Sequence, residues 1–154
     1  MALNEGDHLP SFDLPTDSDG RLATGDLAGQ AAVIYFYPKD DTPGCTTEAQ
    51  GFRDHLAAFS AAGVRVIGVS KDTAAKHDKF KAKHDLPFTL ISDADGDICE
   101  SFGVWVEKSM YGKKYMGIER ATFLVAGDGT IAKIWRKVKV KGHVEEVLAA
   151  AEAL

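Results

Sequence analysis

The segment AAVIYFYPKDDTPGCTTE occupies residues Ala31–Glu48 and organises the rest of the chain. Residues 31–37 form a continuous apolar run, which ends at Pro38 and is followed by a short polar turn. Beyond Cys45, apolar residues recur at intervals of three and four, at Phe52, Leu56 and Phe59. An apolar run that ends in a turn is typical of a buried strand, and the later spacing is typical of a helix. The segment therefore predicts a strand, a tight turn and a helix that begins close to Cys45.

The predicted position of Cys45 has chemical consequences. The first turn of a helix carries backbone N–H groups without intrahelical partners, together with partial positive charge. Both favour a thiolate over a thiol, so a cysteine at this point is expected to be reactive. Thr42 lies three residues earlier, where its hydroxyl can cap the helix or hydrogen-bond a substrate oxygen beside the sulfur. The alternative is a small hydrophobic cysteine that only packs at the start of the helix.

Length and composition narrow the class of protein. The chain has 154 residues, a net charge of −5 and two cysteines far apart in the sequence. This length predicts a single domain over residues 1–154 with a full hydrophobic core. The charge gives no electrostatic reason to expect nucleic acid or an anionic membrane surface as a partner. The N-terminus lacks a signal-peptide core and no apolar run is long enough to span a bilayer, so we expect a cytoplasmic protein.

Further elements follow from the same kinds of pattern. The run Val64–Val69 predicts a second buried strand after the Cys45 helix ends near Ala62, and this crossover implies a parallel pair in an α/β fold. A Lys-rich surface helix is predicted from Ser70 or Asp72 to His84. The other predicted elements are an extended segment at Leu9–Leu14, a strand at Leu90–Ser92, a short helix at Asp95–Phe102, a hairpin of Ala121–Val125 and Ile131–Trp135 around Asp128-Gly129, and an amphipathic helix at Gly142–Ala153.

The spacing Pro38-x-x-x-Thr42-x-x-Cys45 after a predicted strand resembles the active-site motif of the peroxiredoxins, which are thiol peroxidases. The resemblance implies that the Cys45 thiolate attacks the O–O bond of hydrogen peroxide or an organic hydroperoxide, giving a sulfenic acid and water or an alcohol. It also implies that Pro38 shields the sulfur and shapes the turn, because proline removes a backbone donor. Phe36 and Tyr37 alternate across the strand, so one is expected to line the pocket and the other the core.

The resemblance extends over nearly the whole chain, and the bacterioferritin comigratory protein (PrxQ) branch is the most similar part of the family. Pro10–Leu14 with the later Asp19-Gly20 resembles the opening hairpin of the family, and Gly117–Val125 resembles the strand that brings an arginine to the cysteine. The implied fold is thioredoxin-like, with a central mixed β-sheet flanked by helices and an N-terminal β-hairpin. No cofactor is implied, and no Cys/His cluster has the spacing of a metal site.

Arg120 and Glu48 are the charged residues expected to support Cys45. Arg120 is permanently cationic and has several directed donors, which suits it to hold the sulfur ionised and to stabilise charge on the departing oxygen. The alternative for Arg120 is a surface position on an edge strand. Glu48, three residues after Cys45, complements the positive end of the helix. The resemblance implies that it also holds Arg120 by an ion pair.

The second half of the cycle is where the sequence departs from the family pattern. Many members of the branch carry a resolving cysteine five residues after the reactive one, where this chain has Gln50. Others carry it in the following helix, where this chain has Lys81. Cys99 remains, on an inward stripe with Ile98 and Phe102, which favours a structural role over a resolving one. We therefore expect a one-cysteine enzyme whose sulfenic acid is reduced by an external thiol such as thioredoxin, glutaredoxin or glutathione.

The alternatives come from other mechanisms and other function classes. A two-cysteine cycle would use Cys99 as the resolving residue. A thiol–disulfide oxidoreductase normally needs two cysteines separated by two residues, but Cys45 is followed by Thr46, Thr47 and Glu48. A non-catalytic thioredoxin-like chaperone or binding module has no need of Thr42, Cys45 and Arg120 together. Members of the branch are often monomeric, and we expect a monomer here.

The remaining charged features are interpreted as structural. The basic run Lys133–Lys141 partly alternates as an edge strand should, and lysines on such a strand oppose edge-to-edge association. Lys113 and Lys114 are expected in a long loop near the site. Four histidines are expected on solvated surfaces: His55, His77, His84 and His143.

Overall fold

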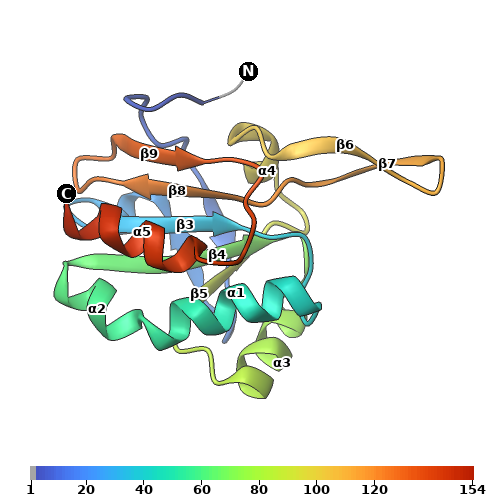
Figure 1. Ribbon diagram of the computed structural model, residues 1–154, viewed down its shortest axis with the longest axis horizontal. Coiled ribbons are helices and arrows are strands. Elements are labelled where there is room, and N and C mark those ends of the chain that lie inside the picture. The colour runs from blue at the N-terminus through green and yellow to red at the C-terminus, as the bar shows by residue number, and fades with distance from the viewer. Residues whose placement is uncertain (1–2) are drawn as a thin grey trace.

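A mixed β-sheet forms the centre of the computed structural model, which describes residues 3–154 (Figure 1). Within these residues the sheet has five strands in the order β5-β4-β3-β8-β9. The central strand β3 (Ala31–Phe36) pairs in parallel with β4 (Val64–Ser70) and antiparallel with β8 (Ala121–Val125). β5 (Thr89–Ser92) extends the parallel side, and β9 (Ile131–Trp135) extends the antiparallel side. The mixed sheet expected from the sequence is confirmed.

β3 is buried on both of its faces, which explains why its residues form a continuous apolar run instead of alternating. One face of the strand contributes Ala32, Ile34 and Phe36 to the core. The other face, continued by the residue after the strand, contributes Val33, Tyr35 and Tyr37 to a second core. The sheet therefore separates two hydrophobic clusters.

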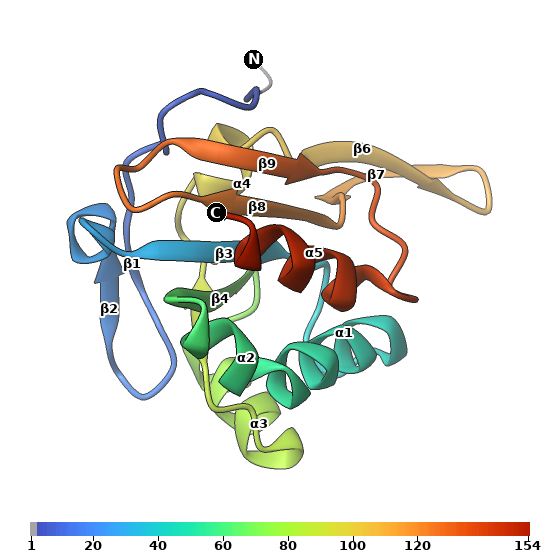
Figure 2. The ribbon, with the colours of Figure 1, turned by 60° about the vertical axis from the view of Figure 1, so that its left-hand side comes forward.

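Helices cover one face of the sheet (Figure 2). Tyr35 belongs to the core on this face. The helices are α1 (Pro43–Asp54), α2 (Leu56–Ala61) and α5 (His143–Glu152), with α3 (Ala74–His84) alongside β5. Their inward side chains join the cluster of this face, which we call the helical-face core: Ala49, Phe52, Phe59, Phe80, Val144 and Val147. Cys45 belongs to the same cluster.

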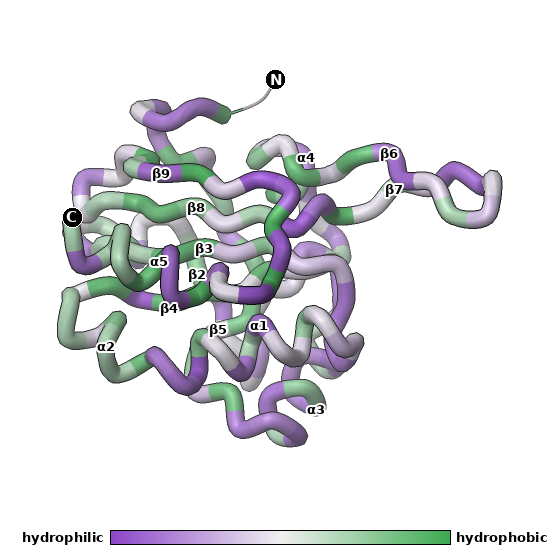
Figure 3. Tube along the Cα trace, in the orientation of Figure 1, coloured by the Kyte–Doolittle hydropathy of each residue, from purple (hydrophilic) through white to green (hydrophobic). Residues whose placement is uncertain are grey.

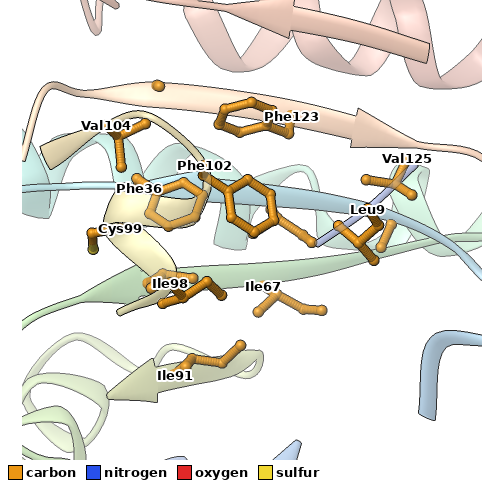
Figure 4. Packing of buried hydrophobic residues seen from close by; sticks show 14 of the residues in the cluster. Leu9, Phe36, Ile67, Ile91, Ile98, Cys99, Phe102, Val104, Phe123 and Val125 are labelled. Carbon is orange, nitrogen blue, oxygen red and sulfur yellow. The ribbon is translucent and has the colours of Figure 1, made fainter. Parts of the chain in front are cut away.

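The opposite face is covered by the N-terminal part of the chain and by one short helix. The N-terminal hairpin expected from the sequence is present, as β1 (Asp13–Pro15) and β2 (Arg21–Ala23), and is followed by the 3-10 helix η1 (Thr24–Leu27). The short helix is α4 (Ile98–Ser101). The residues buried on this face, which we call the hairpin-face core, include Leu22 and Leu27. Phe36, Cys99, Phe102 and Phe123 belong to the same core (Figure 4).

A two-stranded ribbon projects from the molecule beside the sheet (Figure 1). It consists of β6 (Trp105–Met110) and β7 (Lys113–Ile118). The expectation that Lys113 and Lys114 lie in a loop is wrong, because both belong to β7. Most of the outer ribbon is exposed, and it lacks the continuous apolar colour of β8 (Figure 3). Without a buried face there is no alternation for a sequence pattern to reveal.

The helices lie where the sequence patterns placed them, but one predicted helix is two in the structure and the ends differ. The helix that follows Cys45 was predicted to continue to Ala62, and it is interrupted at His55, whose ring Nδ1 lies 2.9 Å from the Gly51 carbonyl oxygen. The surface helix starts at Ala74 because the Thr73 hydroxyl accepts from the Lys76 N–H at 3.2 Å and caps it. In residues 3–154, no helix has both the length and the apolar character needed to cross a bilayer.

Two histidines that the sequence placed on the surface are buried, and two are half-buried. His77 of α3 is fully buried against Asp40, and His143 of α5 is 4% exposed with its Nε2 2.7 Å from the Thr122 hydroxyl. Burial lowers the pKa of His143 to about 4. The prediction failed because the partners of both rings lie far away in the sequence. His55 and His84 are half-buried.

Candidate active site

The site begins where β3 leaves the sheet and the chain turns into α1. Thr42 is the N-cap residue of α1, Pro43 is the first helical residue, and Cys45 lies in the first turn. The backbone carbonyl of Thr42 accepts from the Thr46 N–H at 2.8 Å. The strand, turn and helix predicted around Cys45 are therefore confirmed. Pro43 suits this position because its missing N–H would have no intrahelical partner.

The Thr42 side chain does not cap the helix. Its hydroxyl donates to the backbone carbonyl of Lys39 at 2.9 Å, across the turn. Because the hydroxyl proton is used there, the oxygen presents its lone pairs as acceptors. The capping role considered for this hydroxyl is therefore not observed.

Arg120 joins Cys45 to Glu48. Its Nη2 donates to Cys45 Sγ at 3.3 Å, and its Nη1 donates to Glu48 Oε1 at 2.6 Å. Arg120 lies between β7 and β8, one residue before Ala121, which pairs with Phe36 at the end of β3. The arginine therefore precedes the strand instead of lying within it, and the sheet register brings it to the turn. The ion pair with Glu48 that the family resemblance implied is present.

Burial sets the electrostatics of this group. Cys45 is 2% exposed and Glu48 is fully buried. Burial raises the pKa of Glu48 to about 7, although Arg120 opposes the shift. The second carboxylate oxygen of Glu48 has no hydrogen-bond partner within residues 3–154. Burial disfavours the charge of Arg120, but Glu48 and Cys45 outweigh it and keep the pKa of the guanidinium above its ordinary value. A permanent cation therefore faces the sulfur.

The aromatic residues before the turn divide between the two cores. Tyr37 shares the helical-face core with Cys45, whereas Phe36 packs on the other face, 4.9 Å from the ring of Phe102. Tyr37 is thus the residue on the side of the site. Pro38 follows it, half-buried, at the start of the turn.

Two features near the site were not predicted from the sequence. The first is a buried network in which the Tyr37 hydroxyl and His77 Nδ1 each lie 2.6 Å from the carboxylate of Asp40. The second is Lys108 of β6, a half-buried residue whose pKa is lowered by burial and by the nearby charge of Arg120. No pattern signalled either feature, because the network joins distant segments and β6 has no apolar periodicity.

The two positions at which relatives carry a resolving cysteine are engaged in other contacts. Gln50 Nε2 lies 3.5 Å from Nδ1 of His84, which connects α1 to α3. Lys81 Nζ donates to Asp17 Oδ2 at 2.6 Å, which connects α3 to the N-terminal hairpin. Both side chains therefore hold α3 against its neighbours.

Cys99 lies on the other side of the sheet from Cys45. It is fully buried in the hairpin-face core together with Phe36, Ile98 and Val104 (Figure 4). Burial, and then the nearby Asp93, raise the pKa of its thiol. Both causes favour the neutral thiol of Cys99.

The described residues 3–154 contain no group of three or more His, Cys, Asp or Glu side chains that could hold a metal ion.

Residues 6–134 match the model of the AhpC/TSA family. The chain is 49% identical to Peroxiredoxin Bcp of Bacillus subtilis over 148 residues, which is 96% of this chain and 94% of the relative. A structure of PrxQ from Xylella fastidiosa superposes with a TM-score of 0.94 at 41% identity, covering 99% of this chain and 98% of that one. A structure of Peroxiredoxin Q from Xanthomonas campestris gives 0.88 at 47% identity, over 92% and 90% of the two chains. These similarities confirm the thioredoxin-like fold that the sequence predicted.

Proposed function

The chain belongs to the AhpC/TSA family and is a peroxiredoxin, a thiol-dependent peroxidase, and on this premise we propose a one-cysteine catalytic cycle at Cys45. The single observation that carries the assignment is the Arg120 guanidinium, which bridges Cys45 Sγ at 3.3 Å and Glu48 Oε1 at 2.6 Å. The proposed substrate is hydrogen peroxide or an organic hydroperoxide.

In the oxidation step, the Cys45 thiolate attacks one oxygen of the peroxide. An S–O bond forms, the O–O bond breaks, and the departing oxygen takes a proton and leaves as water or an alcohol. Arg120 stabilises the thiolate before the attack and the charge on the departing oxygen during it. Glu48 holds the guanidinium in place through the second arm of the bridge.

Thr42 and Pro38 complete the proposed pocket. The Thr42 hydroxyl donates to Lys39, so its oxygen can accept a hydrogen bond from the O–H of the peroxide and fix the peroxide beside the sulfur. Pro38 has no N–H and contributes an apolar wall at the start of the turn, which limits the access of water to the sulfenic acid.

In the reduction step, an external thiol attacks the sulfenic sulfur and releases water, and a second thiol then releases Cys45 from the mixed disulfide. This mechanism is supported by the position of Cys99 in the core on the opposite face of the sheet. It is also supported by Gln50 and Lys81, which occupy the two usual resolving positions. Thioredoxin, glutaredoxin and glutathione are the candidate reductants.

The organisation of the protein is proposed from the same resemblance. We propose that residues 1–154 form one domain, since the two hydrophobic cores share a single sheet. We propose that it acts as a monomer, as members of the branch often do, and that it is cytoplasmic, as expected from its N-terminal sequence.

Replacing each cysteine separately tests the cycle. Peroxide consumption with an excess of dithiothreitol should be lost in Cys45→Ser and kept in Cys99→Ser, because only the first sulfur is placed to react. Loss of activity in Cys99→Ser, with a folded protein by circular dichroism, would favour the two-cysteine alternative. Activity in Cys45→Ser would refute the assignment of the nucleophile.

A further inference from the structure

A buried imidazole of α3 holds the turn that precedes Cys45. His77 is fully buried, and its two ring nitrogens face two different segments. Nδ1 lies 2.6 Å from Asp40 Oδ2 in the turn, and Nε2 lies 2.9 Å from the backbone carbonyl oxygen of Ile91 in β5. The Tyr37 hydroxyl donates to Asp40 Oδ1 at 2.6 Å.

These contacts fix the number of protons in the network. The Ile91 carbonyl only accepts, so Nε2 must carry a proton. A second proton must lie between Nδ1 and Asp40 Oδ2, which are too close to face each other without one. The hydroxyl of Tyr37 already donates to the carboxyl group, which favours the ionised carboxylate. With the second proton on Nδ1, the pair is an imidazolium and a carboxylate.

The pair is joined directly to the turn of the active site. Asp40 lies between Lys39, whose carbonyl accepts from the Thr42 hydroxyl, and Asp41, the residue before Thr42. The Asp40 N–H donates to Asp72 Oδ2 at 2.7 Å, so the backbone of the turn is held as well as the side chain. A buried ion pair with hydrogen bonds on both partners has a defined geometry and resists displacement.

We propose that His77, as an imidazolium paired with Asp40, is a positioning residue for peroxide attack: it fixes the turn that places the Thr42 hydroxyl and Pro38 beside Cys45 Sγ. This inference rests on the proposed role of Cys45 as nucleophile. His77 does not touch the sulfur in this arrangement and acts only through the turn.

The chain offers a matched control for His77 on the same helix. His84 lies seven residues later, and its Nε2 is 3.1 Å from Asp41 Oδ1, so it also joins α3 to the turn. The His84 side chain is 15% exposed and that of Asp41 is 47% exposed, so this pair is more open to water than the pair of His77 and Asp40 and contributes less. The same substitution at the two histidines therefore compares the fully buried contact with a partly exposed one.

The test compares two reactions of the same sulfur in His77→Gln and His84→Gln. Peroxide needs the oriented Thr42 hydroxyl, whereas iodoacetamide needs only the thiolate. In His77→Gln we expect the second-order rate constant for hydrogen peroxide to fall about 10-fold or more while alkylation changes less than about twofold. In His84→Gln both rates should stay within about twofold of the wild type.

A second variant tests rescue by a neutral pair. In the double variant Asp40→Asn/His77→Gln, the asparagine can accept from Tyr37 and donate to the glutamine oxygen, and the glutamine amide can donate to the Ile91 carbonyl. No buried carboxylate is then left without a cation, so the peroxide rate should recover to within about threefold of the wild type.

Several results would overturn the inference. These are an unchanged peroxide rate in His77→Gln, an equal loss in both reactions, and no recovery in the double variant. Because the variants can fail to fold, the wild-type protein supplies an independent measurement. Nitrogen-15 spectra of the His77 ring at neutral pH should show two protonated nitrogens, and the pattern of a neutral imidazole would contradict the proposal. Full peroxidase activity in Cys45→Ser would instead refute the proposed role of Cys45, and this result is distinct from the outcomes for His77.

Discussion

Replacing Arg120 by methionine removes the guanidinium that hydrogen-bonds to both Cys45 and Glu48 while keeping a side chain of similar length. The Arg120 side chain is 16% exposed, so its loss is not compensated by free access of water. Two effects follow. The thiolate loses its cation, and the fully buried carboxyl group of Glu48 loses the partner that opposes its protonation.

The geometry sets the size of the effect on the sulfur. At the 3.3 Å between Nη2 and Sγ, two unit charges attract by about 5 kcal/mol at an effective dielectric constant of about 20 and by about 1.3 kcal/mol in bulk water. Glu48 offsets part of the arginine charge and is protonated once Arg120 is gone. Losing the cation should therefore disfavour the Cys45 thiolate and slow its alkylation at neutral pH.

The assay is the pH dependence of Cys45 alkylation by iodoacetamide, with the ultraviolet absorbance of the thiolate as a second probe. Cys99 is expected to react much more slowly, because burial and then the nearby Asp93 raise the pKa of its thiol. The rate constant for hydrogen peroxide at neutral pH should fall by about 100-fold or more, since charge stabilisation on the departing oxygen is lost too.

Arg136→Met is the matched control for this substitution. The guanidinium of Arg136 lies 5.6 Å from the centre of the Phe123 ring and donates to the Leu3 carbonyl at 3.1 Å. Like Arg120, it is therefore held by contacts within the protein. Its loss should leave the alkylation rate of Cys45 at neutral pH where it is in the wild type. An unchanged alkylation rate in Arg120→Met, or an equal decrease in both variants, would refute the role of Arg120.

Three further substitutions test other parts of the site. Glu48→Gln should flatten the dependence of the free energy of unfolding on pH. In the folded wild type the pKa of Glu48 is about 7, above its ordinary value of 4.5. The wild type therefore loses stability as the pH rises from 4.5 to about 7. The loss amounts to about 3 kcal/mol, and urea unfolding at several pH values would measure it, with an unchanged slope in the variant as the contrary result. Thr42→Val should slow oxidation by peroxide about 10- to 100-fold and alkylation by less than about twofold. Thr47→Val, whose hydroxyl donates to Pro43 in the same helical turn, is its control, and equal rates in both variants would make the Thr42 hydroxyl dispensable. Cys99→Ala should lower the free energy of unfolding by about 1–2 kcal/mol, because it leaves a small cavity. It should leave thiol-dependent peroxide turnover intact. A loss of turnover in a folded variant would count against the one-cysteine cycle.

The parts of the fold that were predictable from the sequence are those in which local pattern and tertiary burial agree. β3 is apolar throughout because both of its faces are covered, and Pro38 marks its end. β8 and β9 have the predicted bounds because the Asp128-Gly129 turn separates two runs of apolar residues. In each case a few neighbouring residues contain the whole signal.

The parts that were not predictable depend on contacts between distant segments. His77 sits in a polar, Lys-rich helix, and only Asp40 and Ile91, far from it in the sequence, make its burial favourable. The ribbon of β6 and β7 forms by cross-strand pairing with little burial, so it lacks periodicity. The Arg120–Glu48 contact was reached from the family resemblance, because 72 residues separate its partners and no local pattern connects them.

The most direct test of the one-cysteine cycle is the intact mass of the reduced protein after one equivalent of hydrogen peroxide, without added thiol. The cycle predicts the gain of a single oxygen, which peptide mapping should locate on Cys45. Loss of two hydrogens in the monomer would mean that Cys99 reaches Cys45, and a covalent dimer would mean that resolution occurs between chains. Either disulfide would contradict the cycle proposed here.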